Sequence, residues 1–173
     1  MLLNNKARII SFSGIILALN LIIMMSINFI PTNKVSILAL ASIFPSIILV
    51  EFGYKISITY NIAQILLGFF LINNKFVYIG YLLSFAIYGI LKSIIETKIK
   101  YFIVEYLLKI SYSTLSFISI YFFTNLFFKL NPIFLFYICY VIIFLIYDYV
   151  YSMTINYYTK NIRNRIKFLN KNK

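Results

Sequence analysis

Residues 133–158 read IFLFYICYVIIFLIYDYVYSMTINYY, and the only charged side chain among them is Asp148. A helix that crosses the hydrocarbon core of a bilayer, which is about 30 Å thick, needs about 20 predominantly apolar residues. The quoted stretch exceeds that length, and further apolar runs precede it along the chain. The sequence therefore predicts an integral membrane protein with several such helices.

The composition excludes most soluble and catalytic classes. Of 173 residues, 62% are hydrophobic and 12% are charged, whereas soluble domains are roughly 45–50% apolar. The chain has no His, one cysteine (Cys139) and five Gly, which removes the ligands and loops that most metal, redox and nucleotide sites use. It also contains no Gly-rich phosphate loop of the G-x-x-x-x-G-K-[ST] type. We therefore expect no enzymatic activity, no metal and no cofactor.

Charged residues and turn signals divide the chain into segments of transmembrane length. Pro31, Gly53 and Pro132 lie in three of the dividing turns. The predicted fold is all-α, a compact bundle of six transmembrane helices followed by a basic tail over 159–173. The six predicted spans are 9–30, 35–50, 56–72, 76–91, 101–128 and 133–158.

The basic residues are distributed unevenly between the two predicted sides. One side holds twelve bases and the other holds three. The larger set is Lys6, Arg8, Lys55, Lys92, Lys98, Lys100 and six in the tail; the smaller is Lys34, Lys75 and Lys129. The positive-inside rule then places both termini in the cytoplasm of a cell-membrane protein. Because the bases lie between apolar runs and not on one basic face, we expect anionic lipid as their partner and no nucleic acid.

Small residues form a stripe on the first predicted span. Ala7, Ser11, Gly14 and Ala18 are spaced by four, three and four, which places them on one helix face. Gly14 and Ala18 would let another backbone approach closely. The stripe predicts an interface either with a neighbouring helix of this chain or with a partner protein.

Polar residues form a similar stripe on the third span, where Asn61 and Gln64 fall near the middle of the membrane. Because an unpaired amide is costly in hydrocarbon, both must find partners. They act either as hydrogen-bonding links between helices or as the floor of a polar ligand pocket.

Three acidic or basic residues lie inside later spans. Glu105 and Lys109 are four residues apart in the favourable order, which predicts a local pair. Asp148 is the single acid of the last span and is interpreted either as half of a structural ion pair or as a functional group.

Several short motifs resemble those of the substrate-binding S components of energy-coupling factor (ECF) transporters of low-GC Gram-positive bacteria. They are Gly14-Ile-Ile-Leu-Ala18-Leu-Asn20, Ile30-Pro-Thr-Asn-Lys34, Leu38-Ala-Leu-Ala-Ser42, Glu51-Phe-Gly-Tyr54 and Tyr88-Gly-Ile-Leu-Lys-Ser-Ile-Ile-Glu96. The resemblance implies a subunit that captures a vitamin or other small nutrient from outside. It also implies two kinds of partner, a transmembrane scaffold that docks on the Gly14 and Ala18 face and two cytoplasmic ATPase subunits. The signatures of riboflavin, thiamin, biotin and folate binding are not matched, so the substrate stays open.

A ligand that enters from outside would meet the polar residues at that end of the bundle first. Lys34 and Lys75 would suit an anionic group, or they serve as ordinary solvated charges at loop ends. The predicted ligand residues are Asn28, Thr32, Asn33, Lys34, Asn73, Lys75, Tyr78 and Tyr81, with Asn61 and Gln64 below them.

Two other functions are compatible with the same sequence. A non-transport membrane scaffold or assembly subunit would explain why no ligand constellation stands out. An ion-coupled carrier would use the acids Glu105 and Asp148.

Overall fold

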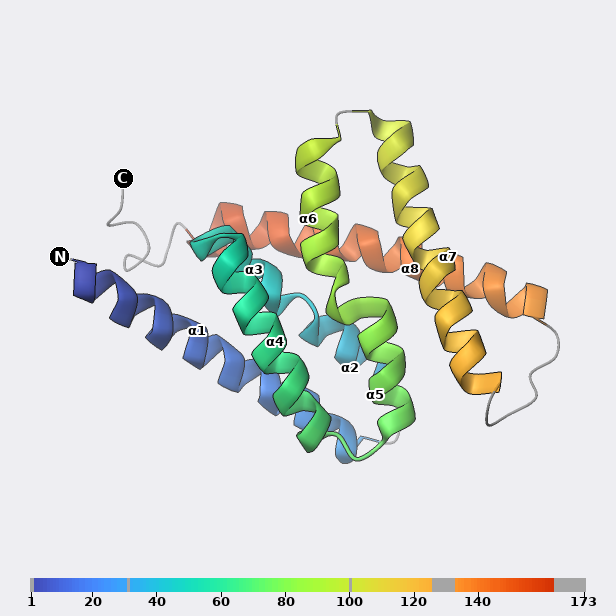
Figure 1. Ribbon diagram of the computed structural model, residues 1–173, viewed down its shortest axis with the longest axis horizontal. Helices are drawn as coiled ribbons and strands as arrows, with labels where there is room; N and C mark the ends of the chain where they lie inside the picture. Colours follow the sequence, from blue (N-terminus) through green and yellow to red (C-terminus); the bar gives the residue numbers. More distant parts are fainter. Residues whose placement is uncertain (1, 31, 100, 126–132, 164–173) are drawn as a thin grey trace.

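The computed structural model describes residues 2–30, 32–99, 101–125 and 133–163, and these residues form helices without a strand (Figure 1). The all-α prediction is therefore confirmed. The elements are α1 (Leu2–Met25), the short 3-10 helix η1 (Ser26–Asn28), α2 (Lys34–Ala41), α3 (Phe44–Phe52), α4 (Tyr54–Leu71), α5 (Lys75–Tyr81), the π-helical η2 (Leu82–Ala86), α6 (Tyr88–Lys98), α7 (Phe102–Asn125), α8 (Ile133–Tyr157) and the π-helical η3 (Tyr158–Ile162).

Five segments of the described chain are long and apolar enough to cross a membrane. These lengths and compositions indicate a multi-pass membrane protein. The five are Lys6–Asn28, Lys34–Phe52, Lys75–Lys98, Phe102–Asn125 and Phe134–Ile162. The third predicted span corresponds to α4, which has 18 residues but contains the buried amides Asn61 and Gln64 and is not among the five. A sixth crossing and the cytoplasmic placement of the termini stay predictions.

Two of the five segments are interrupted helices. The second is divided at Ser42 and Ile43, and Pro45 follows in the first turn of α3. Proline has no amide donor and fits a helix interior poorly but a first turn well, so one helix ends and another begins here. In the other segment, the π-helical turns of η2 join α5 to α6.

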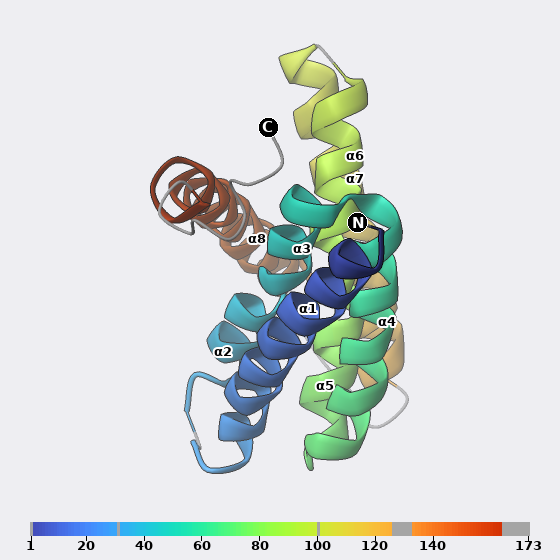
Figure 2. The same ribbon diagram turned by 90° about the vertical axis from the view of Figure 1, so that its left-hand side faces the viewer.

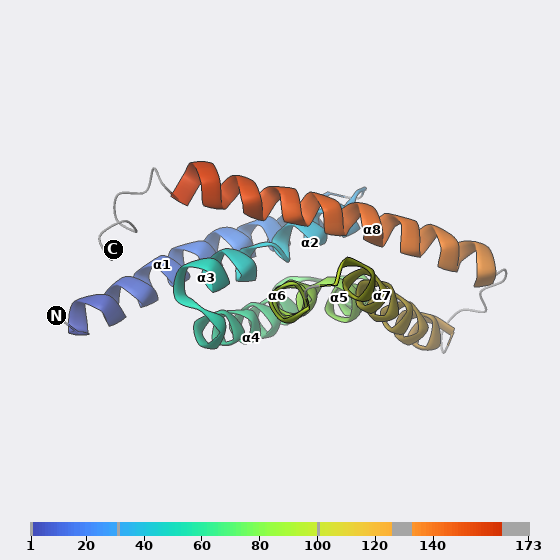
Figure 3. The same ribbon diagram turned by 90° about the horizontal axis from the view of Figure 1, so that it is seen from above.

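The helix ends lie in several places, with the end of α6 and the start of α7 at the top of Figure 1. The start of α1, the turn between α3 and α4 and the end of α8 lie on the left of Figure 1, whereas η1 and the turn between α4 and α5 lie at its lower edge. Figure 2 shows α1 passing alongside α4. Figure 3 shows α4, α5, α6 and α7 in one layer and α8 in another, with α2 and α3 between them.

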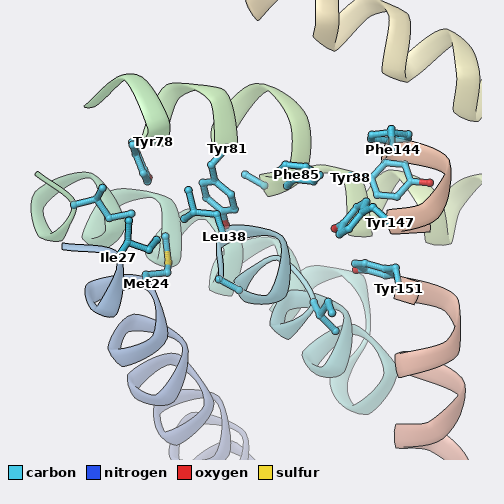
Figure 4. Close-up of a cluster of buried hydrophobic side chains, with 14 residues drawn as sticks. Met24, Ile27, Leu38, Tyr78, Tyr81, Phe85, Tyr88, Phe144, Tyr147 and Tyr151 are labelled. Atoms are coloured by element: carbon cyan, nitrogen blue, oxygen red, sulfur yellow. The ribbon is translucent and has the colours of Figure 1, made fainter. Parts of the chain in front are cut away.

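Aromatic side chains fill the space between the two layers (Figure 4). Tyr78 and Tyr81 of α5 lie near Met24 and Ile27, whereas Tyr88 of α6 lies among aromatic residues of α8. Several buried tyrosine hydroxyls have a hydrogen-bond partner, as expected where an unsatisfied polar group would be costly. The pairs are Tyr81 with Gln64 (2.7 Å), Tyr147 with Ser42 (2.6 Å), Tyr88 with Asp148 (2.5 Å) and Tyr151 with Ser46.

The fourth predicted span ends at Leu91, but α6 continues to Lys98. The predicted end treated Lys92 as a loop charge in water. In the structure Lys92 is buried and paired with acids, so its charge does not end the helix. Parts of the prediction lie outside the described residues: Lys100, the 126–132 turn with Lys129, and residues 164–173 of the tail.

Candidate functional site

Five charged residues from three helices meet at one place, and we call them the charge cluster. They are Lys92 and Glu96 of α6, Glu105 and Lys109 of α7, and Asp148 of α8. Lys92, Lys109 and Asp148 are buried, whereas the side chain of Glu96 is 40% exposed. The cluster therefore extends from the protein interior to the surface.

Asp148 lies at the centre of the charge cluster. Its Oδ1 atom accepts hydrogen bonds from the Lys92 ammonium and from the Tyr88 hydroxyl, the latter at 2.5 Å. Its Oδ2 atom lies 3.2 Å from Nζ of Lys109. One carboxylate thus links α6 and α7 to α8.

The two glutamates complete the ionic contacts. Glu96 Oε1 lies 2.9 Å from Nζ of Lys92 and 2.9 Å from Nζ of Lys109. Glu105 Oε1 lies 2.6 Å from Nζ of Lys109. Two ammonium groups therefore face three carboxylates. By formal charge the cluster has one carboxylate in excess.

The sequence anticipated part of this arrangement. The predicted Glu105 and Lys109 pair is present, and Asp148 is ion-paired. The contribution of Lys92 and Glu96 was missed because both were assigned to a loop. One signal was available: Tyr88, Lys92 and Glu96 follow each other at intervals of four, which places them on one helix face.

A cavity of about 180 Å³ adjoins the charge cluster. It lies between α3, α6 and α8, and Lys92 and Glu96 form part of its wall. Its lining includes Val50, Thr97 and Asn156 from the last turns of these helices, and it extends back to Gly89 near the start of α6.

Several predicted ligand residues lie near the turn between α4 and α5, where they hydrogen-bond to other residues of this chain. Asn28 donates to the carbonyl of Leu71 at 2.8 Å and accepts from the amide of Asn73 at 3.0 Å. The Lys75 ammonium donates to the Ile72 carbonyl at 2.8 Å, which caps the end of α4.

The remaining predicted ligand residues divide between surface and core. Thr32 and Asn33 are exposed, and Lys34 begins α2 at a half-buried position. Tyr78 and Tyr81 are buried in the aromatic core.

Asn61 and Gln64 bind neighbouring helices. Asn61 donates to the carbonyl of Ala86 at 2.9 Å, at the end of the π-helical segment. Gln64 donates to the Tyr81 hydroxyl at 2.7 Å and to the carbonyl of Ala41 at 3.3 Å, where α2 ends. Both amides thus bind carbonyls at helix ends, as expected of links between helices. Their oxygen atoms are buried and have no partner among the described residues.

The small-residue stripe of α1 points outward. Ala7, Ser11, Gly14 and Ala18 are all exposed. A Cβ atom added to Gly14 would meet no atom of the described chain within 4 Å. The stripe is therefore not an interface between helices of the described chain.

No protein-family model, curated protein or solved structure matches the chain. The features that bear on its function are the outward stripe of α1, the cavity and the charge cluster.

Proposed function

We propose that the chain is the substrate-binding membrane subunit of an ECF-type uptake transporter, which captures a small nutrient and has no ATPase activity of its own. The observation that supports this proposal is the outward stripe of α1. Ala7, Ser11, Gly14 and Ala18 are all exposed, so their small side chains leave room for a partner helix. A transmembrane scaffold that carries two cytoplasmic ATPase subunits would supply both that helix and the energy.

The arrangement of helix ends favours the cytoplasmic placement of both termini in the cell membrane. The start of α1 and the end of α8 lie at the same end of the molecule (Figure 1). That end carries the bases Lys6 and Arg8, which the positive-inside rule assigns to the cytoplasm.

Capture of a substrate from outside would require the residues around the turn between α4 and α5 to move. Asn28 and Lys75 bind carbonyls at the end of α4, the backbone N–H of Asn73 donates to Asn28, and Tyr78 and Tyr81 are buried in the core. Gln64 is buried, so a nutrient could reach it only after the surrounding helices had moved.

The filled interior favours a second candidate, a non-transport scaffold or assembly subunit of the membrane. In this role Tyr81 and Gln64 would hold the bundle together, and the stripe of α1 would still bind a partner. The two candidates differ in whether the chain is needed for uptake of a small molecule.

Co-purification from the native membrane tests the docking surface. Gly14→Leu with Ala18→Leu should abolish recovery of an ATPase-bound partner, because the larger side chains prevent close helix contact. Ile15→Phe is the matched control, since Ile15 is 63% exposed on the same helix but outside the stripe. Unchanged recovery with the double variant would refute docking through the stripe. Partner loss without loss of nutrient uptake in the same cells would favour the scaffold role.

A further inference from the structure

The cavity between α3, α6 and α8 has a volume of about 180 Å³. It is smaller than typical ligand pockets of roughly 300–1,000 Å³, so it suits a molecule of only a few non-hydrogen atoms or a headgroup. The lining combines the apolar Val50 and Ile155 with the polar Ser93, Thr97 and Ser152. This mixture resembles that of ligand pockets, in which a few polar groups orient a partly apolar molecule.

Two hydroxyls of the wall can serve a ligand only as acceptors. The Ser152 hydroxyl donates its proton to the Asp148 carbonyl at 3.0 Å, and the Thr97 hydroxyl donates to the Ser93 carbonyl at 2.8 Å. A hydroxyl whose proton is used in this way offers only lone pairs to a ligand.

The ammonium protons of Lys92, which lines the cavity, are also used in contacts within the chain. The Lys92 ammonium has three protons, and it contacts Asp148 Oδ1, the Asp148 carbonyl and Glu96 Oε1. It has no proton left for an anionic ligand. A hydrogen-bond donor therefore fits this cavity better than a carboxylate or phosphate does.

The formal charge of the charge cluster also favours a cationic hydrogen-bond donor as the ligand. The charge cluster has one carboxylate more than it has ammonium groups, and Glu96 is its member that lines the cavity with a 40% exposed side chain. Both Glu96 and Glu51 have cation partners: Glu96 contacts Lys92 and Lys109 at 2.9 Å, and Glu51 contacts Arg163 at 3.1 Å. The preference for a cation therefore rests on the excess carboxylate of the charge cluster, to which Glu96 belongs and Glu51 does not. Val50 in the last turn of α3 and Thr97 in the last turn of α6 both line the cavity, and a helix dipole is negative at that end.

We propose that this cavity binds a small molecule or lipid headgroup through a primary ammonium group, with Glu96 as its counter-ion. The hydroxyls of Thr97 and Ser152 accept hydrogen bonds from the ammonium group, and the Tyr151 ring is part of the cavity wall. Val50 and Ile155 cover the carbon atoms of the ligand. The proposal does not depend on docking through α1.

Binding of ethanolamine to the full chain in lipid nanodiscs tests the proposal. In nanodiscs of phosphatidylglycerol, ethanolamine should bind saturably, and sodium chloride or sodium acetate at equal ionic strength should not reproduce the signal. Glu96→Gln should weaken binding by about tenfold or more, because it removes a charged hydrogen-bond acceptor. Glu105→Gln is the matched control: it removes the same charge from the charge cluster, but Glu105 is not among the residues that line the cavity.

A second variant keeps the test decisive if Glu96→Gln does not fold. Val50→Phe fills the cavity without changing any charge, and it should also abolish binding. Absence of ethanolamine binding to the unmodified chain would overturn the proposal, as would equal losses in Glu96→Gln and Glu105→Gln or equal binding of sodium. Nanodiscs that contain phosphatidylethanolamine identify the source of the ammonium group. Competition with ethanolamine there indicates a lipid headgroup, and unchanged binding indicates a free amine.

Discussion

Nζ of Lys109 lies 3.2 Å from Oδ2 of Asp148, although the two residues are 39 positions apart in the sequence. The contact joins α7 to α8, and Oδ1 of the same carboxylate joins α6 to α8 through Lys92. Three helices therefore depend on one buried acid. Removing a single partner from such a group is expected to cost more than removing an opposite pair together.

Lys92→Met should destabilise the protein by about 3–5 kcal/mol, because Asp148 would then lose a buried partner. Lys98→Met is the matched control, since Lys98 is exposed on the same helix. Thermal unfolding in one detergent would compare the two variants. Adding Asp148→Asn to Lys92→Met should recover part of the loss. Strictly additive losses in the double variant would show that the two charges are not coupled.

Gly89→Ala should destabilise the bundle by about 1–3 kcal/mol through overpacking. An added Cβ would overlap the Tyr151 hydroxyl oxygen and lie 2.7 Å from Ser46 Oγ. Gly80→Ala serves as the control, because a Cβ there meets no atom of the described chain within 4 Å. Tyr151→Phe, which removes the nearest atom, should partly rescue Gly89→Ala. Equal stability of the two alanine variants would contradict the close packing of α6 against α8.

Gln64→Leu should cost about 0.6–2 kcal/mol, the range measured for hydrogen bonds between membrane helices. The variant leaves the Tyr81 hydroxyl without the amide that binds it at 2.7 Å. Tyr81→Phe removes the other half of the same bond. A double-mutant cycle by unfolding in mixed detergents should therefore give a combined loss smaller than the sum of the single losses. A combined loss equal to that sum would mean that the bond contributes nothing.

The all-α membrane class could be predicted from the sequence because it depends on the length and polarity of segments such as residues 133–158. Helix boundaries were less predictable where a charge is neutralised inside the protein. Lys92 was read as a loop residue, since a lone lysine ends an apolar run, and its contact with Asp148 across 56 residues carries no local signal. Only the spacing of Tyr88, Lys92 and Glu96 indicated a shared face.

The candidate site was harder to predict because it depends on contacts between residues that are far apart in the sequence. Asn28 and Lys75 are polar residues at the ends of apolar runs, a pattern shared by ligand groups and by helix caps. The structure places both at the end of α4 as capping groups. The outward direction of the Gly14 stripe was also undetermined, because residue spacing defines a face but not what covers it.

The sidedness of the protein is the prediction on which the uptake proposal depends. Without the buried Lys92, eleven bases against three predict that the turn at Asn73 is outside and the end of α6 at Lys98 is inside. In a Cys139→Ser background, a membrane-impermeant maleimide added to intact cells should label Asn73→Cys and leave Lys98→Cys unlabelled. Both native side chains are exposed, so both variants should react once the cells are permeabilised, which is the control for accessibility. The reverse pattern would invert the topology and place the Glu96 cavity outside the cell. Labelling of both sites in intact cells would refute the predicted alternation of spans between them.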